Sequence, residues 1–182
     1  MERQPGLGEF RRAHHRLLEQ ARRLTVTVPE NDVALADTAR SFLASWQGEA
    51  SILFRKEEEV LLPVLARHGG DLEEKPIAQM LAQHASIRGL VMELSDEAVR
   101  GEVRRETLRS LGGRLEDHVR LEERVVLPLI EKTLPGDAFE EAASRLEAFE
   151  VGRLPAEPWV PTGSLSFDPY PGPGDSEGGG WD

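Results

Sequence analysis

The chain has 182 residues, a formal net charge of -11 at pH 7 and no cysteine. The lack of cysteine excludes disulfides, thiolate metal ligands, iron–sulfur clusters and a thiol nucleophile. The negative charge argues against nucleic acid as the main partner, because phosphate binding depends on clustered Lys and Arg side chains. No apolar run approaches the roughly 20 residues that a membrane helix needs, and the N-terminus lacks an apolar signal region. We therefore expect a soluble, cytoplasmic globular protein with no membrane partner.

Apolar residues that recur at steps of three and four residues predict four long helices and a short fifth helix. Asn31 or Asp32 is expected to cap the second helix, and Pro76 falls in the first turn of the third, where proline is tolerated. Four long helices joined by short breaks predict an all-α, up-down-up-down four-helix bundle over residues 1–150. The expected helices span about residues 7–25, 33–67, 75–99, 102–134 and 137–149.

The composition changes after the fifth predicted helix. Residues 152–182 hold six prolines and seven glycines, which predicts an irregular tail over residues 151–182. A purely solvated linker rarely contains four aromatic residues, so we expect part of this tail to lie in an apolar groove. That groove is either on the same domain or on a partner subunit, and the second arrangement would make the protein a homodimer. The aromatic residues are Trp159, Phe167, Tyr170 and Trp181.

The sequence contains an internal repeat. Residues 54–65 (FRKEEEVLLPVL) and residues 119–130 (VRLEERVVLPLI) align at an offset of 65, each with an acidic cluster, an apolar run and a proline. An internal proline removes one backbone hydrogen bond from a helix, so we expect kinks at Pro63 and Pro128. The chain is therefore expected to consist of two similar halves, each with a pair of helices.

Three of the five histidines and two glutamates follow the inward faces of the predicted helices. A single histidine on an apolar face is more often a hydrogen-bonded core residue than a metal ligand. Here three of them are in phase with two glutamates, and a buried glutamate is costly unless it is paired or bound to a metal. The glutamates come from helices two and four, so they can approach from opposite sides and bridge two ions. The predicted ligands are His14, Glu57, His84, His118 and Glu122.

Imidazole and carboxylate donors suit iron or manganese and also accept zinc. His118 and Glu122 lie four residues apart, so both can reach one ion or one pair of ions. The neighbouring acids Glu58, Glu59 and Glu123 point about 100° or more away around their helices, and we expect them to be solvated. His15 should face outward, and His68 is expected at a helix end.

At these residues the chain resembles hemerythrin-like proteins of the class called the HHE cation-binding domain. The resemblance covers about residues 8–134. The family pattern is a His on helix one, HxxxE on helix two, a His on helix three and HxxxE or HxxxD on helix four. It implies a non-haem site with two iron ions that meets O2 or related small oxidants. Carried over to this sequence, it implies metal ligation by His14, Glu57, His84, His118 and Glu122.

The chain departs from that pattern in helix two. Leu53 stands where the family has a His, and Met80 stands where oxygen carriers have a second helix-three His. Glu49 lies one turn before Leu53 and is the candidate replacement ligand. The alternatives are that Glu49 orients a ligand histidine or is simply part of the polar surface.

The sequence is compatible with three functions. The first is a non-haem iron protein that binds or senses O2, peroxide or nitric oxide, since a site with missing ligands leaves an open coordination position. The second is a dimetal oxidase or peroxidase that activates O2 or destroys peroxide. The third is a degenerate bundle that holds one metal ion or none because Leu53 has replaced a ligand.

Overall fold

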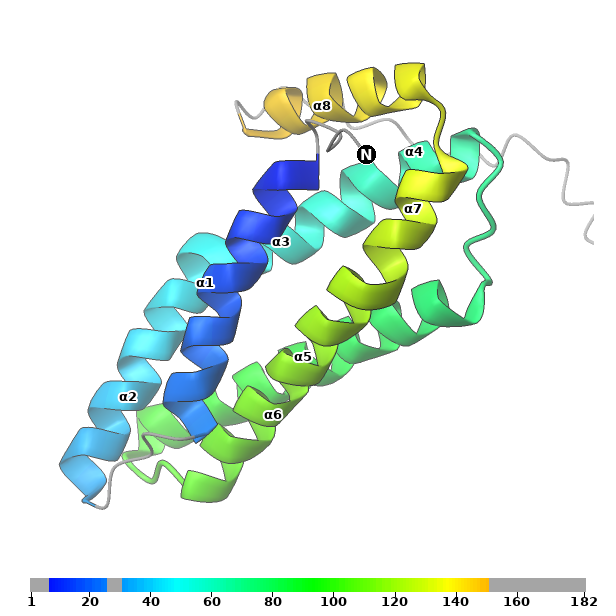
Figure 1. Cartoon of the computed structure of the whole chain (residues 1–182). Coiled ribbons are helices and arrows are strands. Elements are labelled where there is room, and N and C mark those ends of the chain that lie inside the picture. Colours follow the sequence, from blue (N-terminus) through cyan, green and yellow to red (C-terminus); the bar gives the residue numbers. More distant parts are fainter. Residues whose placement is uncertain (1–6, 26–30, 151–182) are drawn as a thin grey trace, which may run out of the picture.

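The computed structural model describes residues 7–25 and 31–150 as five helical rods (Figure 1). The first rod is α1 (Gly8–Thr25), the third is α5 (Lys75–Arg100) and the fifth is α8 (Gly136–Glu150). The second rod consists of α2 (Asp32–Ser45), η2 (Trp46–Ala50), α3 (Ser51–Lys56), η3 (Glu57–Leu61) and α4 (Leu62–Arg67). The fourth rod consists of α6 (Arg105–Leu121), η4 (Glu122–Val126) and α7 (Leu127–Thr133).

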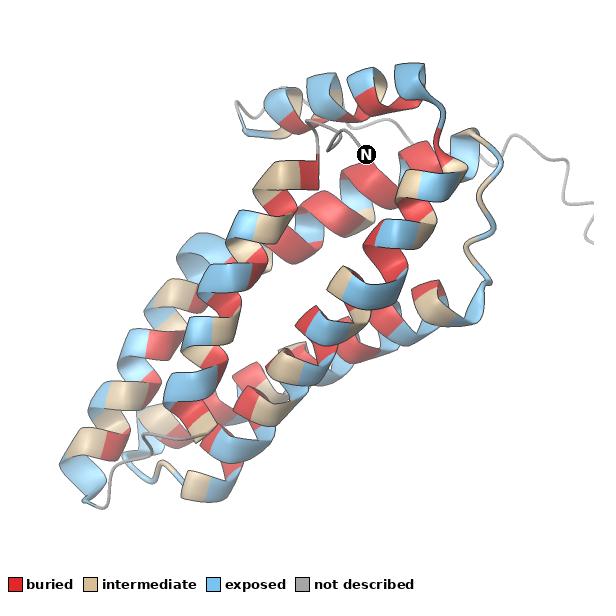
Figure 2. Ribbon diagram, in the orientation of Figure 1, coloured by how far each residue is buried: buried red, intermediate tan, exposed pale blue. Residues whose placement is uncertain are grey.

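These rods confirm the predicted all-α bundle and its helix boundaries to within a few residues. α1 packs on α6, α6 packs on α5, and α5 packs on α2, so the first four rods enclose one core. Figure 2 shows that the buried residues of each rod lie on the side that faces the other rods. Among the described residues, no helix is long and apolar enough to cross a membrane. The predicted aromatic tail lies outside the described residues.

The helix ends follow from local chemistry. Asn31 is the N-cap of α2, as expected, and its side chain accepts a hydrogen bond of 2.8 Å from the backbone of Ala34. α5 ends at Gly101, which has a φ of +73°. Residues with a side chain rarely adopt that left-handed conformation, so glycine provides the stop.

The two repeat prolines are accommodated by π-helical turns. The Leu62 backbone N–H donates to the Glu57 carbonyl, and the Leu127 N–H donates to the Glu122 carbonyl, each across five residues. Pro63 then opens α4 and Pro128 opens α7. The disturbance expected at each proline therefore takes the form of a widened turn in the residues just before it. Each widened turn begins at a glutamate predicted to bind metal, and such turns often occur at functional sites.

α8 lies across one end of the bundle (Figure 1) and packs on η3 and α4. Two groups of ion pairs hold it. Lys56 is buried and its ammonium lies 2.7 Å from Glu150, while His68 Nε2 lies 2.9 Å from Glu141. His68 caps the end of α4, as predicted. α8 therefore covers the end of the bundle next to the second π-helical turn, η3.

Gly112 allows α1 and α6 to approach closely. A Cβ atom at this position would lie 2.7 Å from the Ala21 carbonyl oxygen, 2.7 Å from Thr25 Cγ2 and 2.9 Å from Leu24 Cβ. The backbone carbonyl cannot move without shifting α1. Gly112 therefore sets the spacing between the two rods, whereas the adjacent Gly113 faces open space.

We expect Gly112→Ala to destabilise the fold by about 1–3 kcal/mol, because the added methyl group overpacks the contact between α1 and α6. Gly113→Ala is the matched control and should stabilise α6 by roughly 0.5–1 kcal/mol, since alanine loses less entropy in a helix. Urea unfolding of both variants measures the difference. Equal effects of the two substitutions would contradict this account of the packing.

Candidate metal centre

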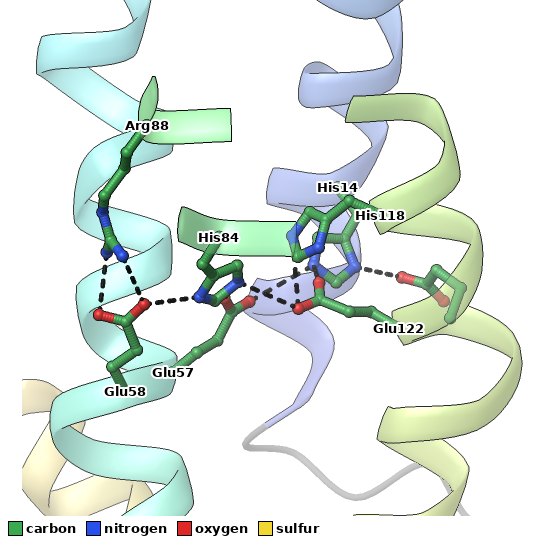
Figure 3. Close-up of polar contacts among 8 residues, drawn as sticks. His14, Glu57, Glu58, His84, Arg88, His118 and Glu122 are labelled. Carbon is green, nitrogen blue, oxygen red and sulfur yellow. Dashed lines mark hydrogen bonds and ion pairs between the residues drawn. The ribbon is translucent and has the colours of Figure 1, made fainter. Parts of the chain in front are cut away.

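The five predicted ligands meet in the middle of the bundle (Figure 3). His14 comes from α1, Glu57 from η3, His84 from α5, His118 from α6 and Glu122 from η4. Their side chains are at most 3% exposed. Ligand atoms of the last four lie within 4.8 Å of one another. Four helical rods thus bring nitrogen and oxygen donors to a single buried point.

Each of the two carboxylates directs its two oxygens to opposite sides of the cluster. Glu57 Oε1 lies 3.6 Å from His14 Nε2, and Glu57 Oε2 lies 3.3 Å from His84 Nε2. Glu122 Oε2 lies 2.7 Å from His14 Nε2, and Glu122 Oε1 lies 3.4 Å from His118 Nε2 and 3.7 Å from His84 Nε2. One oxygen of each glutamate therefore faces the His14 side, and the other faces the His84 and His118 side.

The donor atoms of this cluster lack hydrogen bonds, although they are buried. All four glutamate oxygens and all three Nε2 atoms have none, and His14 Nε2 remains without one despite its short contact with Glu122. Buried polar atoms nearly always form hydrogen bonds, and a cluster in which so many form none is costly even where imidazoles and carboxylates lie close together. A cation bound among them would satisfy the atoms together. The residues present therefore fit a metal ion with nitrogen and oxygen ligands.

A second set of carboxylates holds two of the histidines in orientation. His14 Nδ1 lies 2.7 Å from Glu123 Oε1, and His84 Nδ1 lies 2.6 Å from Glu58 Oε1. Donation from each Nδ1–H leaves Nε2 free to bind metal. Glu58 is itself held by Arg88, whose guanidinium donates two hydrogen bonds of 2.8 and 2.9 Å.

This arrangement corrects the expectation that Glu58 and Glu123 are solvated acids. Each lies about a quarter exposed and contacts a ligand histidine on a neighbouring rod. The repeat contains a signal for this role, because each of the two acids directly follows a ligand glutamate in its copy. Glu59 does remain at the surface, where it pairs with Arg55 at 2.7 Å.

His118 differs from the other two histidines. Both of its ring nitrogens lack a hydrogen-bond partner among the described residues. Burial lowers the pKa of its imidazole to about 4, and the neighbouring charges of His84 and His14 act in the same direction. His118 is therefore neutral at pH 7, which is the form that binds metal.

The pKa values of His14 and His84 are raised, in contrast to that of His118, because carboxylates lie next to both rings. Burial by itself lowers the pKa of both rings. Contacts with Glu122, Glu123 and Glu57 outweigh the burial of His14 and raise its pKa to about 11. Contacts with Glu122 and Glu57 do the same for His84 and raise its pKa to about 9. Both are thus protonated at neutral pH without a cation, and a bound cation must displace those protons.

The two glutamates also differ in charge. Burial and the neighbouring charge of Glu122 raise the pKa of Glu57. Burial acts in the same direction on Glu122. Below pH 4, however, His118 is charged as well, and together with His14 and His84 it outweighs burial and lowers the pKa of Glu122 to about 2. Glu122 is therefore the carboxylate that stays ionised, and it is the one that contacts all three histidines.

Phe54 forms an aromatic wall beside the cluster. Its ring stacks on His84 with centroids 3.9 Å apart and meets the edge of His118 at 4.8 Å. Phe54 is completely buried, so this side of the cluster is closed to water. The sequence placed Phe54 next to the missing ligand position but gave no reason to expect that it touches two ligands.

A family model matches this chain over residues 6–130, and its description is hemerythrin HHE cation binding domain. The matched residues include all five clustered side chains. The chain belongs to the hemerythrin HHE cation-binding family. Comparison with curated proteins and with solved structures found no match.

The HHE domain keeps an apolar residue where the family pattern expects a histidine. Leu53 is 6% exposed, and Met80 is buried as well. Glu49 lies outside the cluster, because its side chain is 57% exposed and its carboxylate pairs with Arg16 at 3.1 Å. The structure therefore does not bring Glu49 to the site as a replacement ligand. The ion pair and the position of Glu49 on the outer face of η2 hold it at the surface, the third of the three alternatives.

We expect Glu58→Ala and Glu123→Ala each to weaken metal binding about 10- to 100-fold, because the orienting partner of one ligand histidine is lost. Glu59→Ala is the matched control, since Glu59 belongs to the same acidic cluster but lies at the surface and pairs with Arg55. Competition with a chelator of known affinity measures the change. Equal metal affinity in all three variants would show that Glu58 and Glu123 do not position the ligands.

Proposed function

We propose that this HHE domain is a non-haem iron protein that holds two iron ions and binds or senses O2 or a related small oxidant such as peroxide or nitric oxide. The observation that carries the proposal is the convergence of metal-ligating atoms without hydrogen bonds, from three histidines and two glutamates, in one buried cluster. Mixed imidazole and carboxylate donors suit iron, and manganese or zinc are the other ions that such donors accept.

The orientation of the two carboxylates favours a site with two ions rather than one. Glu57 and Glu122 each direct one oxygen to the His14 side and the other to the opposite side. In this arrangement one ion would be held by His84, His118 and the two glutamates. The other would be held by His14 and the same two glutamates, which gives it fewer protein donors.

Leu53 supports the assignment of small, neutral ligands to this centre. It leaves the His14 side without a fourth protein donor, and bound iron would supply there an open position and redox chemistry. An apolar side chain at that place disfavours charged ligands, which lose hydration on entry. Phe54 closes the other side against water. The residues of the chain thus leave room for a small uncharged molecule.

A second candidate is a dimetal oxidase or peroxidase. It is favoured by the carboxylate-rich donor set and by Glu58 and Glu123. Both acids are partly exposed, and each hydrogen-bonds to a buried ligand histidine. Such residues can pass a proton between solvent and the site. Repeated turnover of peroxide with an added reductant would favour this candidate over a binding or sensing role.

The first experiment is elemental analysis with an absorption spectrum of the purified protein in air. We expect two irons per chain and near-ultraviolet charge-transfer bands. One metal per chain would instead indicate a mononuclear site on the His84 and His118 side. No metal after incubation with ferrous iron would mean that the bundle is degenerate.

Restoring the family ligand with Leu53→His should tighten binding of the second, weaker iron at least tenfold, which corresponds to about 1.4 kcal/mol. Ile52→His is the matched control, because Ile52 is the exposed neighbour of the same position. Stepwise iron titration of both variants and of the unmodified protein measures the affinity of each step. If Leu53→His and Ile52→His behave alike, position 53 is not the missing ligand.

A further inference from the structure

A groove of about 480 Å³ runs between α1 and the η2–α3 segment, and it is separate from the donor cluster. Cavities of this size usually accommodate small molecules. Ala13, Leu17, Ala50 and Leu53 line it and are buried or half-buried. Ala13 and Leu17 stand one residue before and three residues after His14. The groove therefore runs directly alongside the side of the cluster that has the fewest donors.

The charged side chains of the groove are paired with carboxylates. Arg16 pairs with Glu49 at 3.1 Å. Lys56 pairs with Glu9 and, at 2.7 Å, with Glu150. A charged ligand would have to break one of these ion pairs to gain a partner of its own.

Arg55, the third positively charged residue of the lining, also forms an ion pair. It pairs with Glu59 at 2.7 Å, and its guanidinium lies 4.9 Å from the centre of the Phe149 ring. The lining therefore holds three cations and three carboxylates in balance, without an unpaired charge among the residues described. This balance favours a neutral occupant.

The shape and polarity of the groove further restrict the class of ligand that it can bind. The lining of α1 extends from Glu9 to Gln20, which corresponds to roughly 16 Å along the helix axis. At the Gln20 end lie the side chains of Gln20 and Ser45, neither of which forms a side-chain hydrogen bond within the described part of the chain. One end of the groove thus offers polar groups to a ligand. Leu17, Ala50 and Leu53 form a buried apolar floor, and the Arg16–Glu49 pair, more than half exposed, lies at the rim above it.

We propose that this groove binds a neutral small molecule with an elongated apolar body and a hydroxyl-like polar end. The apolar body lies on Leu53, and the polar end reaches Gln20 and Ser45. The inference goes beyond the proposed function, because binding in the groove does not require a metal ligand. Its place beside His14 would put the bound molecule one side chain from the metal centre.

The test uses three probes that share one apolar chain and differ in charge: 1-octanol, octanoate and octylammonium. Binding to the full-length purified protein is followed by ligand-observed NMR titration. We expect saturable binding of 1-octanol and at least tenfold weaker binding of both ions. No saturable binding of 1-octanol, or binding of either ion as tight as that of the alcohol, would overturn the proposal.

Two variants locate the binding. Ile52→Trp and Gly48→Leu enlarge side chains that line the groove, and a Cβ at Gly48 meets no atom within 4 Å. Each should weaken 1-octanol binding at least fivefold. Val99→Trp is the control, because Val99 is 86% exposed on α5 and does not line the groove. Equal weakening by Val99→Trp, or none by the two groove variants, would contradict the location.

The iron content of the same samples is measured in parallel, so the two proposals fail separately. A protein without iron that still binds 1-octanol in the groove would refute the proposed function and leave the groove assignment standing. A protein with two irons and no saturable octanol binding would refute the groove assignment alone.

Discussion

The burial of two carboxylates in the core is the constraint on which the rest of this structure depends. Glu57 and Glu122 are almost completely inaccessible, and neither can be stable there as an unpaired charge. Three histidines from three different rods surround them, and the remaining oxygen lone pairs point at a common centre without hydrogen bonds. The core of the bundle thus contains polar atoms without hydrogen bonds, which a bound cation would satisfy. Metal binding and folding of this domain are therefore expected to be coupled, since the same contacts serve both.

The internal repeat explains how two rods build this centre in the same way. In each copy the first glutamate turns into the cluster at the start of a π-helical turn, and the next glutamate reaches a histidine on a neighbouring rod. Glu57 and Glu58 therefore correspond in role to Glu122 and Glu123. The copies differ one turn earlier, where the second has His118 and the first has Leu53. The asymmetry of the metal centre is thus a consequence of one residue in an otherwise repeated plan.

Much of this could be predicted from the sequence, because it depends on periodicity within single helices. The step of three and four residues located the rods, and the inward phase identified all five clustered side chains. Contacts between rods could not be predicted in the same way. Glu58 does point away from Glu57 around its own helix, but the neighbouring rod brings His84 to it. From sequence alone, a glycine inside a helix indicates a weak point, whereas the approach of α1 makes Gly112 a packing requirement. Glu49 was placed within reach by helix geometry, but its pairing with Arg16 holds it at the surface.

Leu53 lies between the donor cluster and the groove. On its inner side it leaves the His14 side of the cluster without a fourth protein donor, and on its outer side it gives the groove an apolar floor. A histidine at this position would add a ligand, but it would also place a polar ring beneath the groove. Leu53 is therefore an apolar boundary between the donor cluster and the groove. If a molecule bound in the groove responds to the state of the metal, the packing of Leu53 is the shortest physical path by which it can do so.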